Sequence, residues 1–156
     1  MYPLDEIDIK IIQALQADGR APLTQLSEQL QSPHATIRDR IHKMEKAGVI
    51  EGYTAIINPA KIGYLINCYV ELVLDHQVET EQAIQALMTI EEVTEIHILT
   101  GETDAFVRIW ASDIEHLRQI LYAKFANIPG MVRTNTVVVL GTRQKPVPLR
   151  ISDRKE

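Results

Sequence analysis

The chain has 156 residues, 46% of them hydrophobic and 24% charged, and it carries a formal net charge of −5. These values are typical of a globular protein with one ordinary domain or two small ones, not of a disordered chain. With no apolar run near ~18 residues, no basic signal-like start and only one cysteine (Cys68), the sequence predicts a cytoplasmic protein without a membrane span or an internal disulfide.

Three short helices are expected in the first third of the chain. The first is indicated by apolar residues at helical spacing, which are Leu4, Ile7, Ile11, Ile12 and Leu15. Asp5 is expected to cap its start, and Gly19 follows its end. A shorter second helix carries the apolar stripe Leu23, Leu26 and Leu30. The third is expected to start near Ser32–Pro33 and to end at Gly48. Its inward face is expected to consist of Ile37, Ile41 and Met44.

The outward face of the third helix is basic. Arg38, His42 and Lys43 can hydrogen-bond base edges or phosphates, and Thr36 can contact DNA near the helix start. Arg40 lies nearer the core side and is interpreted as a brace that can reach a phosphate. The candidate DNA-binding residues are His34, Thr36, Arg38, Asp39, Arg40, His42, Lys43 and Lys46. An ordinary solvated helix is the alternative, but the preceding helix and tight break favour a helix-turn-helix.

The rest of the chain is acidic or extended. Residues 49–57 are predicted to be extended, and Asn58–Pro59 follows them. Residues 59–140 contain five Lys/Arg and eleven Asp/Glu. Because this field repels phosphate, any contact with DNA has to come from the local basic patch on the third helix.

The remaining segment alternates strands with helices. Strands are expected at residues 66–75, 92–99, 105–111 and 131–140. One helix is expected over residues 80–90, with Ile84, Leu87 and Met88 turned inward. A second helix starts at Asp113, and its inward stripe is Ile114, Leu117, Leu121 and Phe125. The order βαββαβ predicts a ferredoxin-like domain, so the chain as a whole is α+β.

In the expected sheet, the face without helices is apolar as well. Tyr69 and Val73 alternate with Val70 and Leu72 along the first strand, and Phe106 and Trp110 alternate with Val107 and Ile109 along the third. An uncovered apolar face of this size calls for a cover. The economical cover is a second copy of the chain, which predicts a homodimer.

Short motifs follow one another through the chain in a specific order. They are Leu4-Asp5 with Asp8, Asp18-Gly19-Arg20, Arg40-Ile41, Gly48-Val49-Ile50, Gly52-Tyr53-Thr54-Ala55, Asn58-Pro59, Thr100-Gly101-Glu102-Thr103-Asp104 and Ile128-Pro129-Gly130-Met131. This set resembles the Lrp/AsnC (feast/famine) family of bacterial and archaeal transcriptional regulators. There is one departure, because Gln31-Ser32-Pro33-His34 stands where the family usually has Gly-Leu-Ser-Pro. The start of the third helix is therefore defined only to within about one position.

The resemblance implies a sequence-specific DNA-binding regulator, not an enzyme. It implies an N-terminal winged helix-turn-helix and a C-terminal domain that binds a small effector, commonly an amino acid. The candidate effector residues are Gly101, Glu102, Thr103 and Asp104, with Thr134 and Thr136 as secondary contacts. Backbone N–H groups near Gly101 suit a carboxylate, and Asp104 can pair with an ammonium group. A hairpin turn with a capping aspartate is the plain alternative. Dimers are implied to assemble further, for example into octamers.

The predicted organisation is a DNA-binding domain at residues 1–52, a linker at 53–64, a ligand-sensing domain at 65–142 and a tail at 143–156. The tail is either mobile or packed on a neighbour. Two rivals stand beside the regulator. One is a siroheme decarboxylase-like enzyme, since those enzymes resemble the family in both domains, and the other is an interaction module that docks a basic partner. Neither metal nor cofactor is expected, because the five histidines form no ligand pattern and no cofactor motif is present.

Overall fold

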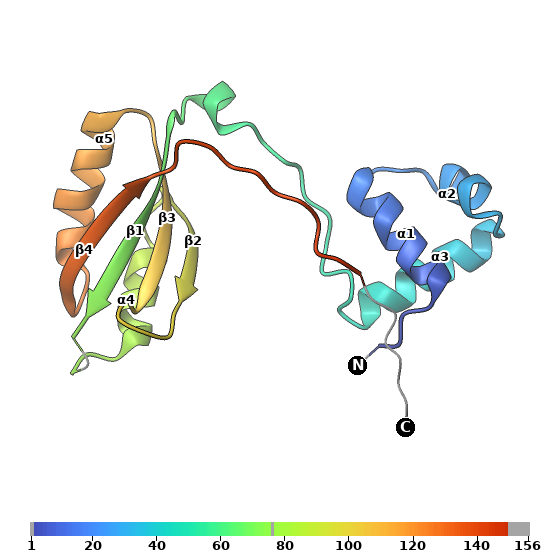
Figure 1. The fold of residues 1–156 in the computed structure, drawn as a ribbon, viewed down its shortest axis with the longest axis horizontal. Coiled ribbons are helices and arrows are strands. Elements are labelled where there is room, and N and C mark those ends of the chain that lie inside the picture. The colour runs from blue at the N-terminus through green and yellow to red at the C-terminus, as the bar shows by residue number, and fades with distance from the viewer. Residues whose placement is uncertain (1, 76, 150–156) are drawn as a thin grey trace. The chain divides into compact units, whose positions relative to one another are not determined.

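The computed structural model describes residues 2–75 and 77–149, which form two compact units (Figure 1). The helix-turn-helix unit contains the residues up to Ile56 together with the tail from Gln144. The sheet unit contains Ile57–Arg143. No helix among the described residues has the length and hydropathy needed to cross a membrane.

Three helices build the helix-turn-helix unit: α1 (Glu6–Ala17), α2 (Leu23–Leu30) and α3 (His34–Lys46). The expected cap at Asp5 is confirmed, and it is reciprocal. The Asp5 carboxylate accepts from the backbone N–H of Asp8, and the Asp8 carboxylate accepts from the backbone N–H of Asp5. The core of this unit consists of Ile11, Ile12, Leu26, Ile37 and Met44.

The turn between α2 and α3 is closed by Gln31, which has a left-handed backbone conformation with φ of 49°. The backbone N–H of Ser32 donates to the Ser27 carbonyl at 3.1 Å and completes the end of α2. The start expected near Ser32–Pro33 is one residue early. Pro33 has an extended ψ of 143° and occupies the cap position, so α3 begins at His34 and no side chain caps it.

The segment after α3 differs from the expectation of a wing. Residues 49–57 are not helical, as predicted, but no strand is present among the described residues of the helix-turn-helix unit. The tail joins this unit instead. Leu149 is partly buried and packs against the core of the three helices. Residues 150–156 of the predicted tail lie outside the described residues.

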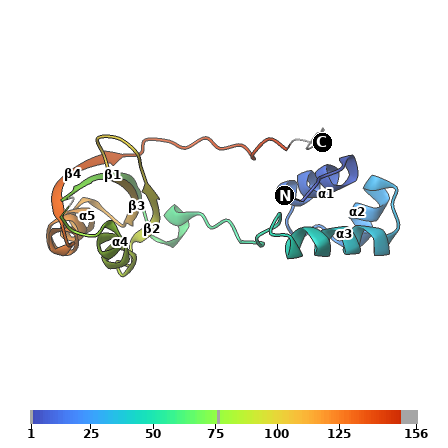
Figure 2. The same cartoon turned by 90° about the horizontal axis from the view of Figure 1, so that it is seen from below.

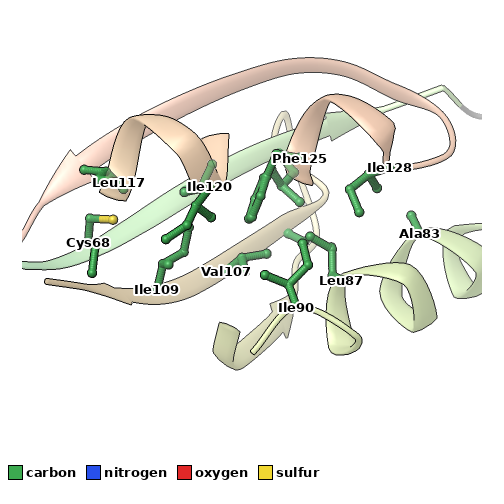
Figure 3. Close-up of a cluster of buried hydrophobic side chains, with 14 of the residues drawn as sticks. Cys68, Ala83, Leu87, Ile90, Val107, Ile109, Leu117, Ile120, Phe125 and Ile128 are labelled. Atoms are coloured by element: carbon green, nitrogen blue, oxygen red, sulfur yellow. The ribbon is translucent and has the colours of Figure 1, made fainter. Parts of the chain in front are cut away.

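The sheet unit confirms the βαββαβ order. Its strands are β1 (Ile66–Leu74), β2 (Val93–Ile98), β3 (Ala105–Ala111) and β4 (Met131–Val138), paired antiparallel in the order β2-β3-β1-β4. The helices α4 (Thr80–Met88) and α5 (Ile114–Gln119) lie on one face of the sheet (Figure 2). Side chains from both helices and the sheet fill the space between them (Figure 3).

The inward faces of the two helices differ from the prediction at particular residues. Met88 and Ile114 are 62% and 68% exposed, whereas Ile90 and Ile120 are buried. The chain after α5 continues as a π-helical turn over Ile120–Lys124. A π turn takes more residues than an α turn, so Phe125 reaches the core five positions after Ile120. Leu117 and Phe125 are buried as predicted, and Leu121 is partly buried.

Candidate nucleic-acid interface and ligand loop

Helix α3 presents most of the predicted DNA-binding side chains to solvent. The exposed ones are His34, Thr36, Arg38, Asp39, His42, Lys43 and Lys46. They share a face because Ile37 and Met44 on the opposite side are fully buried against α1 and α2. The helix has 13 residues, so it is about 20 Å long and fits the major groove of DNA.

The basic side chains Arg38 and His42 on this outward face have only weak partners. Arg38 Nε lies 3.7 Å from Asp39 Oδ1, and both side chains are about two-thirds exposed. His42 Nδ1 lies 3.9 Å from Glu45 Oε2. Exposed pairs of this length contribute little to stability, because solvent screens them. These side chains are therefore free to exchange their partners for a phosphate or a base edge.

Arg40 differs from its neighbours on α3. Its Nη1 donates to Asp5 Oδ2 at 2.6 Å and to Asp8 Oδ1 at 2.8 Å. The bonds to Asp8 and then to Asp5 raise the pKa of the guanidinium. In turn, the backbone N–H of Asp8, followed by Arg40, lowers the pKa of Asp5. This geometry favours the interpretation of Arg40 as a brace and separates it from the exposed set.

In the sheet unit, the loop from Gly101 to Asp104 connects β2 to β3. Gly101 has φ of 132°, a conformation that favours glycine. Asp104 is held on three sides: its N–H donates to the Leu72 carbonyl at 2.9 Å, its carbonyl accepts from Leu99 at 2.8 Å, and its Oδ2 accepts from the Leu74 N–H at 2.8 Å. Asp104 thus anchors the loop to β1. This is the role expected of Asp104 under the alternative interpretation of the loop as a hairpin turn with a capping aspartate.

The other two candidate effector residues are close to this loop in the sheet register. Leu72 of β1 is paired with Ala105 on one side and with Thr134 on the other. Thr136 occupies the next row, opposite Val70. Because adjacent strands are about 5 Å apart, Thr134 lies roughly 10 Å from the end of the loop. The structure therefore brings the loop and the two threonines to one region of the sheet.

The face of the sheet without helices carries both aromatic and charged groups. Tyr69, Phe106 and Trp110 are half-buried on this face. The Arg108 guanidinium lies 5.2 Å from the Trp110 ring centroid and 5.9 Å from that of Tyr69. It also donates to Asn67 at 3.1 Å and to Glu95 at 3.2 Å.

Sequence reasoning missed a polar cluster beside α5 that is centred on the buried carboxylate of Glu92. Glu92 accepts two hydrogen bonds of 2.6 Å from Lys124 Nζ and lies 3.0 Å from His116 Nε2. Burial raises the pKa of Glu92, but the hydrogen bonds from Lys124 and His116 outweigh it, so the pKa is lowered overall. Only the apolar positions of this region showed a sequence pattern. In residues 2–75 and 77–149, no three His, Cys, Asp or Glu side chains are grouped as a metal site requires.

Two family models together match most of the chain. The model described as the AsnC-type helix-turn-helix domain matches residues 4–45, and the Lrp/AsnC ligand binding domain matches residues 67–148. The chain is 37% identical over 149 residues to the HTH-type transcriptional regulator FL11 of Pyrococcus horikoshii, covering 96% of this chain and 97% of FL11. It is 30% identical over 146 residues to the regulatory protein AsnC of Escherichia coli K12, covering 94% of both.

Solved structures show the same fold. The structure of Escherichia coli AsnC matches with a TM-score of 0.83 at 29% identity, covering 96% of this chain and 99% of that one. A transcriptional regulator of Neisseria meningitidis, solved as an L-Met complex, matches with a TM-score of 0.87 at 23% identity, covering 96% and 97%. The named relatives are transcriptional regulators, not enzymes. The siroheme decarboxylase-like alternative therefore finds no support.

Proposed function

Because this chain belongs to the Lrp/AsnC family of DNA-binding regulators with a ligand-binding domain, we propose that α3 reads a specific DNA site and that the second domain dimerises and binds an amino acid. The observation that carries the proposal is the outward face of α3. In a chain with a net charge of −5, Arg38, Lys43 and Lys46 are exposed together on one helix that follows a short helix and a tight turn.

Within this face, the roles divide by position. Thr36 and Arg38 lie near the N-terminal half of α3, which approaches base edges in a helix-turn-helix. His42 and Lys43 follow one turn later, and Lys46 ends the helix. We assign Arg38 to base recognition and Lys43 to a phosphate. Asp39 would repel a phosphate but can accept a hydrogen bond from cytosine.

The proposed effector site is the loop from Gly101 to Asp104 together with Thr134 and Thr136. The backbone N–H groups of the exposed residues Gly101 and Glu102 suit the carboxylate of an amino acid. The second carboxylate oxygen of Asp104, Oδ1, accepts no hydrogen bond from a described residue and suits the ammonium group. The Neisseria meningitidis regulator was solved as a complex with L-Met, so the ligand of that protein is an amino acid.

The proposed dimer pairs two copies through the face of the sheet opposite α4 and α5. Support comes from the half-buried aromatic residues there and from Arg108, whose charge is already satisfied within the same copy by Glu95 and Asn67. Covering such a face removes apolar surface from water, and Arg108 keeps its carboxylate partner Glu95 when the face is covered. We propose further assembly of dimers, up to an octamer, as the family resemblance implies.

One experiment tests the regulator proposal. Duplexes bound by the full chain are selected from a random DNA pool, with and without a panel of the twenty amino acids, and the assembly state is measured by light scattering. We expect a pseudo-palindromic site whose occupancy or bound assembly changes with at least one amino acid. Selection without any sequence enrichment would contradict recognition of a specific DNA site. Occupancy and assembly state that stay the same with every amino acid would contradict an amino-acid effector.

A further inference from the structure

We propose that Arg40 is a positioning residue, which fastens α3 to the N-terminal cap of α1 and thereby sets how well the protein discriminates its DNA site. The inference rests on the proposed DNA-binding function. It concerns a residue that lies on the recognition helix but whose guanidinium bonds to α1. The fastening consists of two hydrogen bonds from Arg40 Nη1, to Asp5 and to Asp8.

All four carboxylate oxygens of this cluster are used. Asp5 Oδ1 accepts from the backbone N–H groups of Ile7 and Asp8, each at 2.9 Å, while Asp5 Oδ2 accepts from Arg40. Asp8 Oδ2 accepts from the backbone N–H of Asp5 at 3.3 Å, while Asp8 Oδ1 accepts from Arg40. A single hydrogen-bonded network therefore joins the first turn of α1 to the middle of α3.

Burial gives this network its stiffness. The Asp8 side chain is only 3% exposed and that of Arg40 is 26% exposed. If Arg40 moved away, a buried carboxylate would lose its cation, which is strongly unfavourable. The position of α3 relative to α1 is thus held at one point by charge, in addition to the apolar contacts of Ile37 and Met44.

Charge also argues against a phosphate contact by Arg40. The guanidinium and the two carboxylates together carry a net charge of −1, so the cluster does not attract DNA. Arg38 and Lys43, in contrast, are exposed on the outward face. Sequence discrimination depends on placing such side chains accurately against base edges, so a loosened α3 loses specificity before it loses its electrostatic attraction to DNA.

The test uses two variants that break the network from opposite ends. Arg40→Gln removes the cation. Asp5→Ser removes a carboxylate but keeps a side chain that caps α1 well. Lys43→Gln serves as the comparison for a phosphate contact, and Lys10→Gln as the control for loss of one positive charge at an exposed site of α1. Each full-length variant is titrated with the duplex selected from the random pool and with a shuffled duplex, across a range of salt concentrations.

We expect Arg40→Gln and Asp5→Ser to lower the affinity ratio of selected to shuffled duplex at least about tenfold. The slope of log K against log salt for Arg40→Gln should equal that of Lys10→Gln, whereas Lys43→Gln should lower the slope by about one. A slope in Arg40→Gln that falls as in Lys43→Gln would place Arg40 on a phosphate and overturn the proposal, and so would an unchanged affinity ratio in both Arg40→Gln and Asp5→Ser.

A measurement without DNA separates this proposal from the function on which it rests. If the wild-type chain binds no duplex, the DNA-binding function fails, but hydrogen exchange still tests the fastening. We expect amides of α3 and of the first turn of α1 to exchange at least about tenfold faster in Arg40→Gln and Asp5→Ser than in Lys10→Gln. Equal exchange rates in α3 would overturn the proposal whatever the DNA result.

Discussion

The two units of this protein differ in how they are held together. Among the residues that the structure describes, the sheet unit buries fifteen hydrophobic residues between its sheet and helices, whereas the helix-turn-helix unit buries five. A core of five cannot provide the same stabilisation, because hydrophobic stabilisation scales with the apolar area removed from water. The smaller unit therefore depends more on contacts outside its core, such as the hydrogen bonds of Arg40 and the packing of Leu149 from the tail. The comparison indicates that the DNA-binding unit is the less stable of the two.

The largest effect should come from a deletion in the small core. Ile37→Ala removes a fully buried side chain of α3 and should cost about 2–5 kcal/mol. Helical circular dichroism should then fall at a lower urea concentration than the fluorescence of Trp110, the single tryptophan, which lies in the sheet unit. Ile109→Ala, the matched deletion in β3, should shift the fluorescence transition instead. Coincident transitions in both variants would contradict two separately stabilised units.

The tail offers a smaller test of the same difference. Leu149→Ala should destabilise the helix-turn-helix unit by about 1 kcal/mol, because this partly buried side chain packs on its core. Val147→Ala is the matched control, since Val147 is 75% exposed in the same tail. Urea unfolding followed by helical circular dichroism measures both. Equal midpoints for the two variants would show that the contact of Leu149 does not stabilise the helix-turn-helix unit.

A comparable gain is expected at the helix break. Gln31 has φ of 49°, which is strained for a residue with a Cβ. Gln31→Gly should therefore stabilise the helix-turn-helix unit by about 1 kcal/mol. Gly48→Ala should act in the opposite direction, because Gly48 has φ of 69° and open space around it, so that only backbone strain changes. If the unfolding midpoints of both variants move in the same direction, backbone strain at positive φ is not the cause of the stability changes.

The smallest effect concerns pH and affects both units. The lowered pKa values of Asp5 and Glu92 mean that each carboxylate is more acidic in the folded state than in the unfolded chain. The stability that they contribute is present above about pH 4 and is lost as pH falls through the folded pKa. In unfolding scans between pH 7 and 2, Asp5→Ser should weaken this acid dependence in the helical signal but leave it in Trp110 fluorescence. An unchanged acid dependence of the helical signal would contradict a role for Asp5.

The sequence predicted features that depend on neighbouring residues. Asp5 was identified as a cap because capping is determined within one turn of helix, and the structure shows the capping bonds. The buried side of α3 followed from the spacing of Ile37 and Met44, and the four strands followed from their two-residue alternation. The candidate DNA-binding residues of α3 were then identified as the polar side chains on the opposite side of the helix.

Features that depend on distant parts of the chain were not predictable in this way. Arg40 finds its carboxylates 35 and 32 residues earlier, so helical spacing placed it near the core without identifying a partner. The docking of Leu149 on the first unit involves an even longer separation. The π turn over Ile120–Lys124 was not predictable either, because the sequence carries no local signal for it, although Phe125 is buried as expected.

The salt dependence of DNA binding by the wild type and by Lys43→Ala tests the central claim most directly. The claim is that the exposed basic face of α3 contacts the duplex despite the net charge of −5. On the selected duplex, affinity should fall steeply as salt rises, and Lys43→Ala should weaken binding to every sequence and reduce the slope of log K against log salt by about one. A slope near zero in the wild type, or one that Lys43→Ala leaves unchanged, would contradict the claim.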